Sequence, residues 1–595
     1  MHMDRYRVLV RVLDQLRAEA PKQYKSYHPP EEDVEMVNAA RSLAFIHLFL
    51  KVRFGLLEFS DREKYITEGS HDGGIDAFYI DSDRKTIYFV QSKFRHTAKN
   101  FEEKTISAEE LLAMDIDRIL GGNPASEDGT PYNGRIQAMV KRIRDIEDIG
   151  RYHNQVIILA NAKGMTRQKL CLLTGGFVAD LIDHARSYRE LLFPLVSGTF
   201  FTADRVQLSL TLSNKNAGAK ISYSVQTQHA KTEITVVFVP TREIAKAMLK
   251  YKNAILKYNP RSYLEHEGQA VNHEIRSSIE NRSTNEFALF NNGITILSDE
   301  TYLNERIGQK DRAQLSLLNP QIINGGQTAY TLSQIYKDNL HGDLDAVFGE
   351  KEVLVKIITF DGTDEVTEQQ KLALIEDISK ATNSQTNVTN ADRRSNEPEL
   401  QALQLKAFER LGLFMERKRG EFTDGIREGY LSAEALVDRN TFLRAAMIAN
   451  RRWREVSLKK IAARCNYATV LNVPDVVFAD YGTGVILLRT IQNNYATTRI
   501  EKRLRTVAAH AYVSLRIIRM RRQTDSFGIA EIEAIANEVG QAWGGFLAYV
   551  ERSRPSFIRA RKGKTSLDFD RYMNSAFLDE DVIDYFVQGR TGEVS

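Results

Sequence analysis

The sequence predicts a mixed α/β fold class, with an α/β domain first, an α+β body after it and a helical region at the C-terminal end. Two short apolar strands that follow a long apolar helix indicate the first domain. Strands that alternate with helices indicate the second, and helical periodicity beyond about residue 430 indicates the third. At 595 residues the chain is too long for a single hydrophobic core, which supports a division into several domains.

The first domain is expected to open with helices and then to build a sheet. Apolar residues recur at helical spacing from Val34 to Val52, and the turn Asp81–Arg84 separates two apolar segments. The unbroken apolar run Val156–Leu159 is typical of a buried strand. In chain order the expected elements are helices at 4–19 and 31–54, strands at 75–80 and 86–94, helices at 107–120 and 134–147, a strand at 156–159 and a helix at 166–190.

Beyond residue 195 the periodicity changes to short alternating strands, then to a mixture, then to helices. The expected strands lie at 206–212, 221–225, 233–239, 286–297, 315–323 and 352–359. The expected helices lie at 242–257, 270–281, 328–338, 364–381, 397–411, 432–449, 484–493, 498–522 and 529–553. These patterns divide the chain into an N-terminal helix (1–30), an α/β domain (31–195), a β-rich connecting region (196–240), an α+β domain (241–470) and a helical C-terminal region (471–595).

Composition indicates a cytoplasmic globular protein with no membrane segment. Hydrophobic residues make up 43% and charged residues 27% of the chain, and no apolar run approaches the roughly 18 residues of a membrane helix. The charged N-terminus lacks the apolar core of a signal peptide. Cys171 and Cys465 lie far apart and fit no metal-binding spacing, which favours a reducing compartment. A net charge of +3 is too small to identify a nucleic-acid partner by itself.

The most informative motif pairs an acid on one expected strand with an amide and a lysine on the next. Gly73 and Gly74 form a tight turn that ends at Asp76, and Gln91 and Lys93, two residues apart, share one side of the following strand. Phosphodiester hydrolysis needs a hard cation that holds the phosphate and activates a water molecule. This arrangement of side chains suits that chemistry, although a solvated surface hairpin would show the same alternation.

Mg²⁺ is the expected cofactor, and Mn²⁺ is expected to substitute for it. Mg²⁺ takes oxygen ligands and commonly only one or two protein carboxylates. Asp76, the amide oxygen of Gln91 and the backbone carbonyl of Ser92 are the expected ligands, and Asp72 is a candidate second acid. Lys93 is expected to orient the nucleophile or to neutralise charge that develops on the phosphate.

These residues resemble the restriction-endonuclease-like PD-(D/E)xK superfamily, and more specifically its Mrr-type branch, in which Gln commonly replaces an acid. The resemblance covers roughly residues 30–190 and implies a mixed sheet flanked by helices, Mg²⁺ dependence and DNA cleavage. It makes Asp76 the metal-binding acid, Gln91 the substitute for the second acid and Lys93 the catalytic lysine. The family often adds a glutamate from its first helix. The candidates for it are Glu32, Glu35 and Glu58.

Three cations near the motif, Lys85, Arg95 and Lys99, are candidates for holding phosphates. Ordinary surface charge explains them equally well.

The second body carries asparagine, glutamine, threonine and glycine at the ends of apolar strands. Such amides can donate and accept hydrogen bonds, so they could contact nucleic acid or form a buried polar network that holds loops together. The candidate residues are Asn292, Asn324, Gln327, Asn383 and Gln385.

The surrounding motifs, Asn-Asn-Gly-Ile-Thr from Asn291, Asn-Gly-Gly-Gln-Thr from Asn324 and Ala-Thr-Asn-Ser-Gln from Ala381, together resemble the AIPR (abortive infection phage resistance) family over roughly residues 235–470. The resemblance implies prokaryotic defence against phage, with defence-system proteins as possible partners. It supplies no catalytic residue in this body.

The expected helix at 498–522 is basic and amphipathic. Its arginines, Arg519 and Arg522 among them, could follow a phosphate backbone, although a solvated surface helix has the same pattern. Because cutting both strands of a duplex commonly uses two sites of opposite polarity, a homodimer is expected.

Three functions follow as hypotheses. The first is a Mg²⁺-dependent DNA endonuclease of anti-phage defence. The second is a nucleic-acid-binding sensor or adaptor with an inactive nuclease fold, and the third is a ribonuclease-type toxin that acts on RNA.

Overall fold

The computed structural model shows two compact units. The N-terminal unit comprises residues 4–382 together with Gly420–Ser432, and the C-terminal unit comprises Asn383–Arg419 and Ala433–Ser595. The structure describes residues 5–589 except 83, 107–113, 162–165, 175, 178, 202, 213–219, 260–269, 306–310, 361–369, 371–372, 376, 379–393, 457, 459, 495–499, 522–527 and 562–563. The structure contains both helices and several sheets, and the mixed α/β fold class is confirmed.

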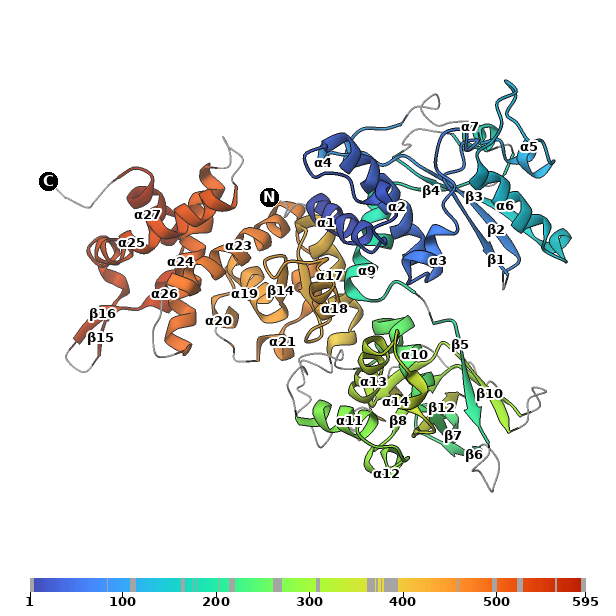
Figure 1. Cartoon of the computed structure of the whole chain (residues 1–595). Helices are drawn as coiled ribbons and strands as arrows, with labels where there is room; N and C mark the ends of the chain where they lie inside the picture. Colours follow the sequence, from blue (N-terminus) through green and yellow to red (C-terminus); the bar gives the residue numbers. More distant parts are fainter. Residues whose placement is uncertain are drawn as a thin grey trace. The chain divides into compact units, whose positions relative to one another are not determined.

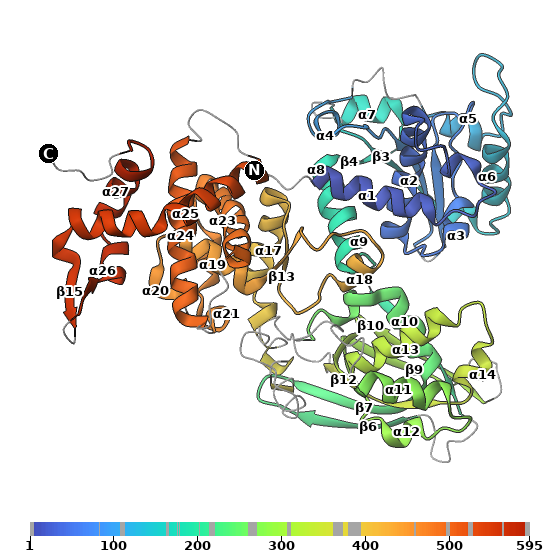
Figure 2. The same ribbon diagram turned by 60° about the vertical axis from the view of Figure 1, so that its left-hand side comes forward.

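The first domain is built on a four-stranded sheet in the order β1 (Ala77–Asp81), β2 (Thr86–Ser92), β3 (His153–Leu159) and β4 (Ala179–Ile182). β1 and β2 are antiparallel, whereas β2, β3 and β4 run parallel. The sheet lies between α2 (Val34–Phe54) and α6 (Gly134–Arg144), as both ribbon views show (Figures 1 and 2). The expected helices and strands up to residue 159 are therefore present, with bounds shifted by a few residues where the structure describes them.

Both faces of this sheet are buried, which explains the apolar runs in its strands. On one side Phe89 and Ile158 join a core that α6 completes with Met139. On the other side Phe54 of α2 stacks on Tyr79 with ring centroids 4.0 Å apart. The remaining helices of this domain are α1 (Arg5–Ala18), η1 (Lys25–Tyr27), α3 (Phe59–Glu63), α4 (Ala98–Glu102), α5 (Ile116–Leu120) and η2 (Ile149–Arg151).

The expected helix at 166–190 is partly wrong. The chain forms α7 (Arg167–Leu173), then β4, and returns to helix in α8 (His184–Arg186), η3 (Ser187–Leu192) and α9 (Phe193–Ser197). β4 pairs with the buried strand β3, so tertiary pairing overrides the local helical pattern.

The second body contains a five-stranded and a three-stranded sheet. The five-stranded sheet has the order β11 (Gln321–Asn324), β8 (Ile294–Ser298), β12 (Glu352–Phe360), β7 (Lys231–Pro240) and β6 (Lys220–Gln226). The three-stranded sheet has the order β5 (Arg205–Thr211), β10 (Arg312–Leu318) and β9 (Glu300–Asn304). The accompanying helices are α10 (Thr241–Tyr251), η4 (Lys252–Leu256), α11 (Ala270–Glu280), α12 (Phe287–Phe290), α13 (Gly326–Asp338) and α14 (Leu344–Phe348).

The expected strand at 286–297 is wrong in its first half, because α12 precedes β8. Asn291 closes the turn between them by accepting a hydrogen bond from the backbone of Gly293, whose φ is 82°. The expected helix at 364–381 lies mostly outside the described residues.

The C-terminal unit is helical, as expected. Its longer helices are α17 (Pro398–Leu411), α19 (Arg439–Ala449), α23 (Asp475–Asn494), α24 (Ile500–Arg521), α25 (Ile529–Ser553) and α27 (Phe577–Phe586). Its shorter elements are η5 (Arg394–Asn396), β13 (Phe414–Glu416), β14 (Leu436–Asp438), α20 (Trp453–Val456), α21 (Ile461–Arg464), α22 (Tyr467–Leu471), η6 (Pro555–Phe557), β15 (Ile558–Arg561), β16 (Lys564–Leu567) and α26 (Phe569–Met573). Helix α18 (Thr423–Arg427) belongs to the N-terminal unit.

Helix α23 begins nine residues before the expected start at residue 484. Glycines usually weaken a helix, but a side chain at Gly484 would come within 3.1 Å of Ala445 in α19. Close packing of α19 against α23 therefore accounts for a glycine inside this helix.

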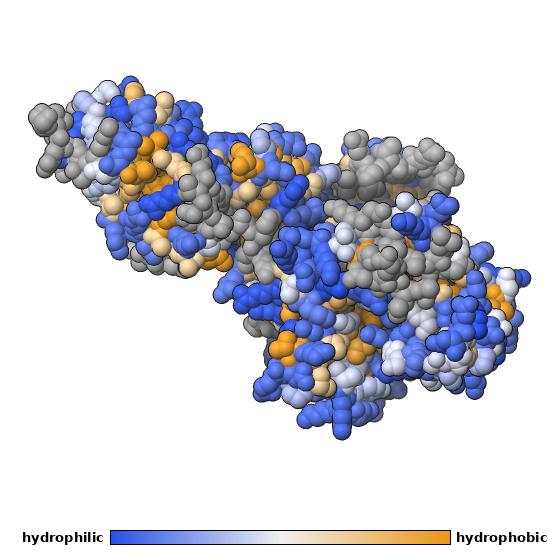
Figure 3. All heavy atoms as spheres, turned by 90° about the horizontal axis from the view of Figure 1, so that it is seen from above, coloured by the Kyte–Doolittle hydropathy of each residue, from blue (hydrophilic) through white to orange (hydrophobic). Residues whose placement is uncertain are grey.

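Hydrophilic side chains predominate on the face drawn in Figure 3, with smaller apolar patches among them. Every helix in the described part of the chain is too short or too polar to cross a lipid bilayer.

Candidate active site

The candidate site is built around a loop that the chain closes with backbone hydrogen bonds. Ile66 forms an isolated bridge with Ala77 at the start of β1. The next two amides, of Thr67 and Glu68, both donate to the carbonyl oxygen of Asp76, at 2.9 and 3.0 Å. The ten residues from Thr67 to Asp76 therefore form a closed loop at the edge of the sheet.

The glycine turn expected from the sequence is present in this loop. Gly73 and Gly74 have φ values of 63° and 74°, which lie in the left-handed region. A side chain at Gly73 would also come within 2.9 Å of Ile119. The carboxylate of Asp72 accepts hydrogen bonds from the backbone of Gly74 at 2.9 Å and of Gly69 at 3.2 Å. Asp72 therefore shapes the loop as well as adding charge to it.

The N-terminal end of α6 forms hydrogen bonds with the loop Thr67–Asp76. Asn133 caps this helix by accepting a hydrogen bond from the backbone of Ile136. Its side-chain amide donates to the carbonyl oxygens of Thr67 and Ser70, at 3.2 and 3.3 Å, and its backbone donates to that of His71 at 3.0 Å. A displacement of α6 would therefore displace the loop.

Asp76 lies immediately before β1 and faces the end of β2. Its backbone donates to the carbonyl oxygen of Val90 at 2.8 Å, and one carboxylate oxygen accepts from the backbone of Ser92 at 2.6 Å. The side chain is buried, with 6% of the residue exposed. The structure thus brings Asp76 beside Gln91, as the paired-strand interpretation expects.

Gln91 and Lys93 follow each other along the same side of the chain at the end of β2. The buried Gln91 amide nitrogen donates to the carbonyl oxygen of Gly74 at 2.9 Å. This bond sets the orientation of the amide and ties β2 to the glycine turn. The backbone of Lys93 donates to the carbonyl oxygen of Leu159 in β3, at 3.0 Å, so the lysine leaves the sheet at a fixed position.

The pKa values of three neighbouring carboxyl groups, those of Asp76, Glu68 and Asp72, are raised at this site. Burial, followed by the charge of Glu68, raises the pKa of Asp76 to about 8, while the Ser92 hydrogen bond and Lys93 oppose the shift. Burial and the charge of Asp72 raise the pKa of Glu68 to about 7. Burial also raises the pKa of Asp72. Because burial first, and neighbouring carboxylates second, disfavour the charged forms of these groups, the site favours a proton or a cation.

Glu68 is the residue that sequence reasoning missed. It lies eight residues before Asp76 in the sequence, outside any expected strand, and no spacing rule links the two. The loop closure described above brings it to the site. Glutamate in a glycine-rich loop next to the motif was the only available signal.

The donor atoms at the site fit a Mg²⁺ ion. The ligands expected from the sequence are all oxygens, namely the Asp76 carboxylate, the Gln91 amide oxygen and the Ser92 carbonyl, which is the chemistry that Mg²⁺ prefers. The hydroxyl of Ser92 is buried and has no hydrogen-bond partner among the described residues. No group of three His, Cys, Asp or Glu residues in the described part of the chain is arranged as a metal site. A Mg²⁺ ion here would therefore keep several water ligands.

The other residues proposed around the site fall into two groups. Lys85 lies at the opposite end of β2 from Gln91 and forms an ion pair with Asp148 at 3.1 Å, so the structure does not bring it to the site. Arg95 and Lys99 follow β2 at the end that carries the site. Glu35 is exposed in the first turn of α2, and the charges that most affect Asp76 do not include it.

In the second body, two of the amide side chains hold local structure. Asn324 accepts a hydrogen bond from the backbone of Gly325 at 2.7 Å, and Gln327 donates to Asn272 of α11 at 2.8 Å. Asn292 is exposed. The other two candidates, Asn383 and Gln385, lie outside the described residues.

The basic helix α24 uses Arg519 within the C-terminal unit. Arg519 donates to the carboxylate of Asp480 in α23 at 2.8 Å and to the carbonyl oxygen of Ala449 at 3.1 Å. Arg522 lies outside the described residues.

Comparison with known proteins supports the resemblance of the second body. Residues 256–524 match the family model described as AIPR protein, and the match extends past the expected region into α24. No curated protein and no solved structure matches the chain. The match supports the AIPR family and suggests involvement in abortive infection against phage. The candidate site lies outside the matched residues.

Proposed function

We propose that this protein is a Mg²⁺-dependent DNA endonuclease of anti-phage defence, with its active site at the start of β1 and the end of β2. The observation that carries the proposal is the buried carboxyl group of Asp76, set beside Gln91 and Lys93 on paired strands and among the charges of Glu68 and Asp72. A divalent cation is the partner that such a cluster of oxygens and negative charge favours.

Asp76 and Gln91, with the Ser92 carbonyl and Asp72 as further candidates, would hold the metal. A bound Mg²⁺ ion would lower the pKa of a water molecule and polarise the phosphate. Lys93 would place its cationic amine where negative charge develops during attack on phosphorus. Arg95 and Lys99, at the same end of β2, would hold flanking phosphates. Mn²⁺ would substitute for Mg²⁺ because it accepts the same oxygen ligands.

Defence against phage supplies the context for this activity. The AIPR match covers residues 256–524, which include part of the second body and part of the helical region, while the candidate site precedes the matched residues in the first domain. We infer that the N-terminal domain cuts nucleic acid and that the matched region recognises a target or a state of the infected cell. Abortive infection would then follow from cleavage of DNA, in a homodimer where both strands are cut.

The decisive test is cleavage of plasmid DNA by the full-length protein in Mg²⁺ or Mn²⁺, with wild type beside Lys93→Ala. Lys93 is not among the expected metal ligands, so the variant should still fold and bind metal. Cleavage should fall by about a hundredfold or more, the usual cost of removing a group that stabilises charge in the transition state. Lys141→Ala, which removes an exposed lysine of α6, is the matched control and should cleave as wild type does.

Equal cleavage by wild type and Lys93→Ala would reject this active site. Linear DNA, single-stranded DNA and RNA of the same length belong in the same assay. Cleavage restricted to RNA would replace the endonuclease with the ribonuclease hypothesis, because the same metal chemistry serves both polymers.

A sensor with an inactive nuclease fold is the second candidate, and two observations favour it. No group of three acidic or histidine ligands is arranged for a metal in the described residues, and Gln91 uses its amide to hold the glycine turn. A sensor would bind DNA and protect cells from phage equally well after Asp76→Ala and Lys93→Ala. Loss of protection in a folded variant would exclude it.

A further inference from the structure

Residues Gly420–Ser432, here called the docking segment, belong to the N-terminal unit although the chain on both sides of them belongs to the C-terminal unit. The segment carries α18 and ends at Tyr430–Ser432. Both ends of the segment continue into the C-terminal unit, so a movement of that unit would pull on the segment through the covalent chain. The contacts that the segment makes within the N-terminal unit determine which residues such a pull would affect.

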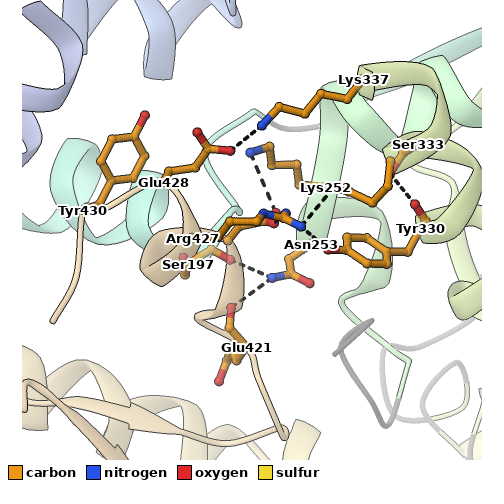
Figure 4. Close-up of polar contacts among 12 residues, drawn as sticks. Ser197, Lys252, Asn253, Tyr330, Ser333, Lys337, Glu421, Arg427, Glu428 and Tyr430 are labelled. Carbon is orange, nitrogen blue, oxygen red and sulfur yellow. Dashed lines mark hydrogen bonds and ion pairs between the residues drawn. The ribbon is translucent and has the colours of Figure 1, made fainter. Parts of the chain in front are cut away.

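Arg427 makes most of the polar contacts of the docking segment with α13. Its guanidinium donates to the hydroxyl of Tyr330 at 2.5 Å and to the amide oxygen of Gln334 at 2.9 Å. Asp424, in the same turn of α18, pairs with Arg427. Figure 4 shows Arg427 directed toward Tyr330 across the edge of the second body.

Two lysines of the second body add ion pairs to the segment. Lys337 at the end of α13 lies 2.7 Å from Glu428 (Figure 4). Lys252 lies 3.7 Å from Asp424. The charges of Lys252, Lys337 and Lys51 all help to lower the pKa of Glu428 against the effect of its burial. Partly exposed ion pairs contribute little free energy each, so the segment is held by contacts that can be released.

The backbone of the docking segment packs closely against the residues around Ser197 and Asn253. Asn253 donates to the carbonyl oxygens of Ser197 and Glu421, at 2.8 and 3.1 Å, and so joins them (Figure 4). A side chain at Gly425 would approach the carbonyl oxygen of Val196 to 2.6 Å. The docked position is therefore specific and not a loose surface contact.

The end of the segment reaches a buried polar network in the first domain. The amine of Lys51 in α2 donates to the hydroxyl of Tyr430 at 3.3 Å and to the carboxylate of Glu19 at 2.7 Å. Glu19 also pairs with Arg62, whose side chain is fully buried. Burial lowers the pKa of Lys51 to about 8, although Glu19 opposes the shift.

From Arg62 the network continues through hydrogen bonds in which each residue donates to the next one. Arg62 donates to Nδ1 of the buried His47 at 3.1 Å, so Nε2 of His47 carries the proton and donates to the hydroxyl of Tyr27 at 2.8 Å. Tyr27 in turn donates to Glu63 at 2.6 Å. Because burial lowers the pKa of His47, the ring is neutral and this assignment is self-consistent.

Glu63 carries the network to the loop of the candidate site. It pairs with Arg135 of α6 at 3.1 Å. Two residues earlier, Asn133 begins the same helix and holds the carbonyl oxygen of Thr67. The charge of Arg135 also opposes the rise in the pKa of Glu68 that burial causes. Hydrogen bonds and ion pairs thus lead from Tyr430 through the buried Arg62, His47 and Tyr27 to the partly exposed Glu63–Arg135 pair. The last step to the loop follows the backbone of α6 from Arg135 to Asn133.

We propose that docking of Gly420–Ser432 and the order of the loop Thr67–Asp76 are coupled through this network, with Arg62, His47 and Tyr27 as positioning residues. Removing one partner from a buried polar network leaves its neighbour unsatisfied and is therefore unfavourable. Release of Tyr430 therefore favours a rearrangement that runs through Arg62 and Glu63 to α6. The coupling does not require that the site cleaves nucleic acid.

Hydrogen–deuterium exchange of the full-length protein, in buffer without divalent metal, tests the coupling directly. Glu428→Lys places a fourth cation among Lys51, Lys252 and Lys337 and should release the segment. Exchange in peptides that span 420–432 and 66–77 should then rise together, by about fivefold or more. The matched control is Asp338→Lys in the last turn of α13, which breaks an ion pair of 2.8 Å with Arg276 but does not touch the segment. This control should leave the exchange rates of both peptides unchanged.

A second variant cuts the network in the middle. With His47→Phe in the background, Glu428→Lys should still increase exchange in the segment but should no longer change exchange in the loop. Tyr27→Phe, which removes only one hydroxyl, serves the same purpose where His47→Phe does not fold. Loop exchange that stays constant while the segment is released would overturn the proposal, as would a loop response that survives both cuts. Nuclease activity enters neither readout, so the coupling and the proposed function fail separately.

Discussion

Replacing Asp76 with Asn should stabilise the metal-free protein, and increasingly so as the pH rises. Burial and the charges of Glu68 and Asp72 raise the pKa of Asp76 from 3.8 to about 8. A carboxyl group with a raised pKa in the folded state binds its proton more tightly there than in the unfolded chain. Stability is therefore fully present below the unfolded pKa and is lost as the pH rises through the folded one.

The magnitude follows from the size of the shift. At about 1.4 kcal/mol for each pKa unit, the stability lost between the unfolded pKa and pH 7, because the unfolded chain releases the proton that folded Asp76 keeps, is on the order of 4 kcal/mol. Asn keeps an oxygen that can accept the hydrogen bond from the backbone of Ser92, so the substitution removes the charge and retains that contact. Most of the 4 kcal/mol should therefore appear as a higher free energy of unfolding.

Thermal unfolding in EDTA between about pH 5 and pH 8 measures this difference. The melting temperature of Asp76→Asn should exceed that of wild type, and the gap should widen with pH. Asp81→Asn, at the partly exposed far end of β1, is the control and should follow wild type. Added Mg²⁺ should raise the melting temperature of wild type and leave that of Asp76→Asn unchanged. Parallel curves for Asp76→Asn and wild type over this pH range would refute the reasoning.

Further substitutions test the loop, the metal site and the helical unit. Gln91→Glu should strengthen Mn²⁺ binding measured by calorimetry, because it adds a charged ligand, and weaker binding would contradict that role. Gly73→Ala should lower the free energy of unfolding by about 1–3 kcal/mol through its positive φ and its contact with Ile119, and a neutral effect would mean that the loop relaxes. Arg519→Leu should lower the melting temperature of the helical unit by removing the ion pair with the buried Asp480, without changing DNA retention in a shift assay. A loss of DNA retention would instead place Arg519 in a nucleic-acid interface.

Local pattern was sufficient for the part of the site that lies on neighbouring strands. Asp76, Gln91 and Lys93 are close in sequence, and the alternation of a strand sets which side each occupies. The glycine turn could be predicted for the same reason, because glycine pairs mark positions with positive φ. What the structure adds is the hydrogen bond from Gln91 to Gly74, which joins the two halves of the motif.

Contacts between distant parts of the chain could not be predicted. Glu68 reaches Asp76 only because a closed loop folds it back, and β4 becomes a strand only because β3 accepts it as a neighbour. Tyr430 meets Lys51 across 379 positions of sequence. A single sequence carries no periodicity or spacing that records such pairs, so pattern reasoning assigned 166–190 to helix and gave the docking segment no role.

The glutamine at position 91 is easier to understand with Glu68 in place. A glutamine instead of an acid removes one negative charge from a metal site and so weakens its attraction for a cation. Glu68 supplies a second carboxyl group near Asp76. Among the neighbouring charges, that of Glu68 raises the pKa of Asp76 the most. Gln91 can then hold the glycine turn through its amide while acids on the loop supply the charge that attracts a cation. Under the proposed function the order of the loop would decide whether the site binds metal, and the proposed coupling would connect that order to the docking segment through Arg62, His47 and Tyr27.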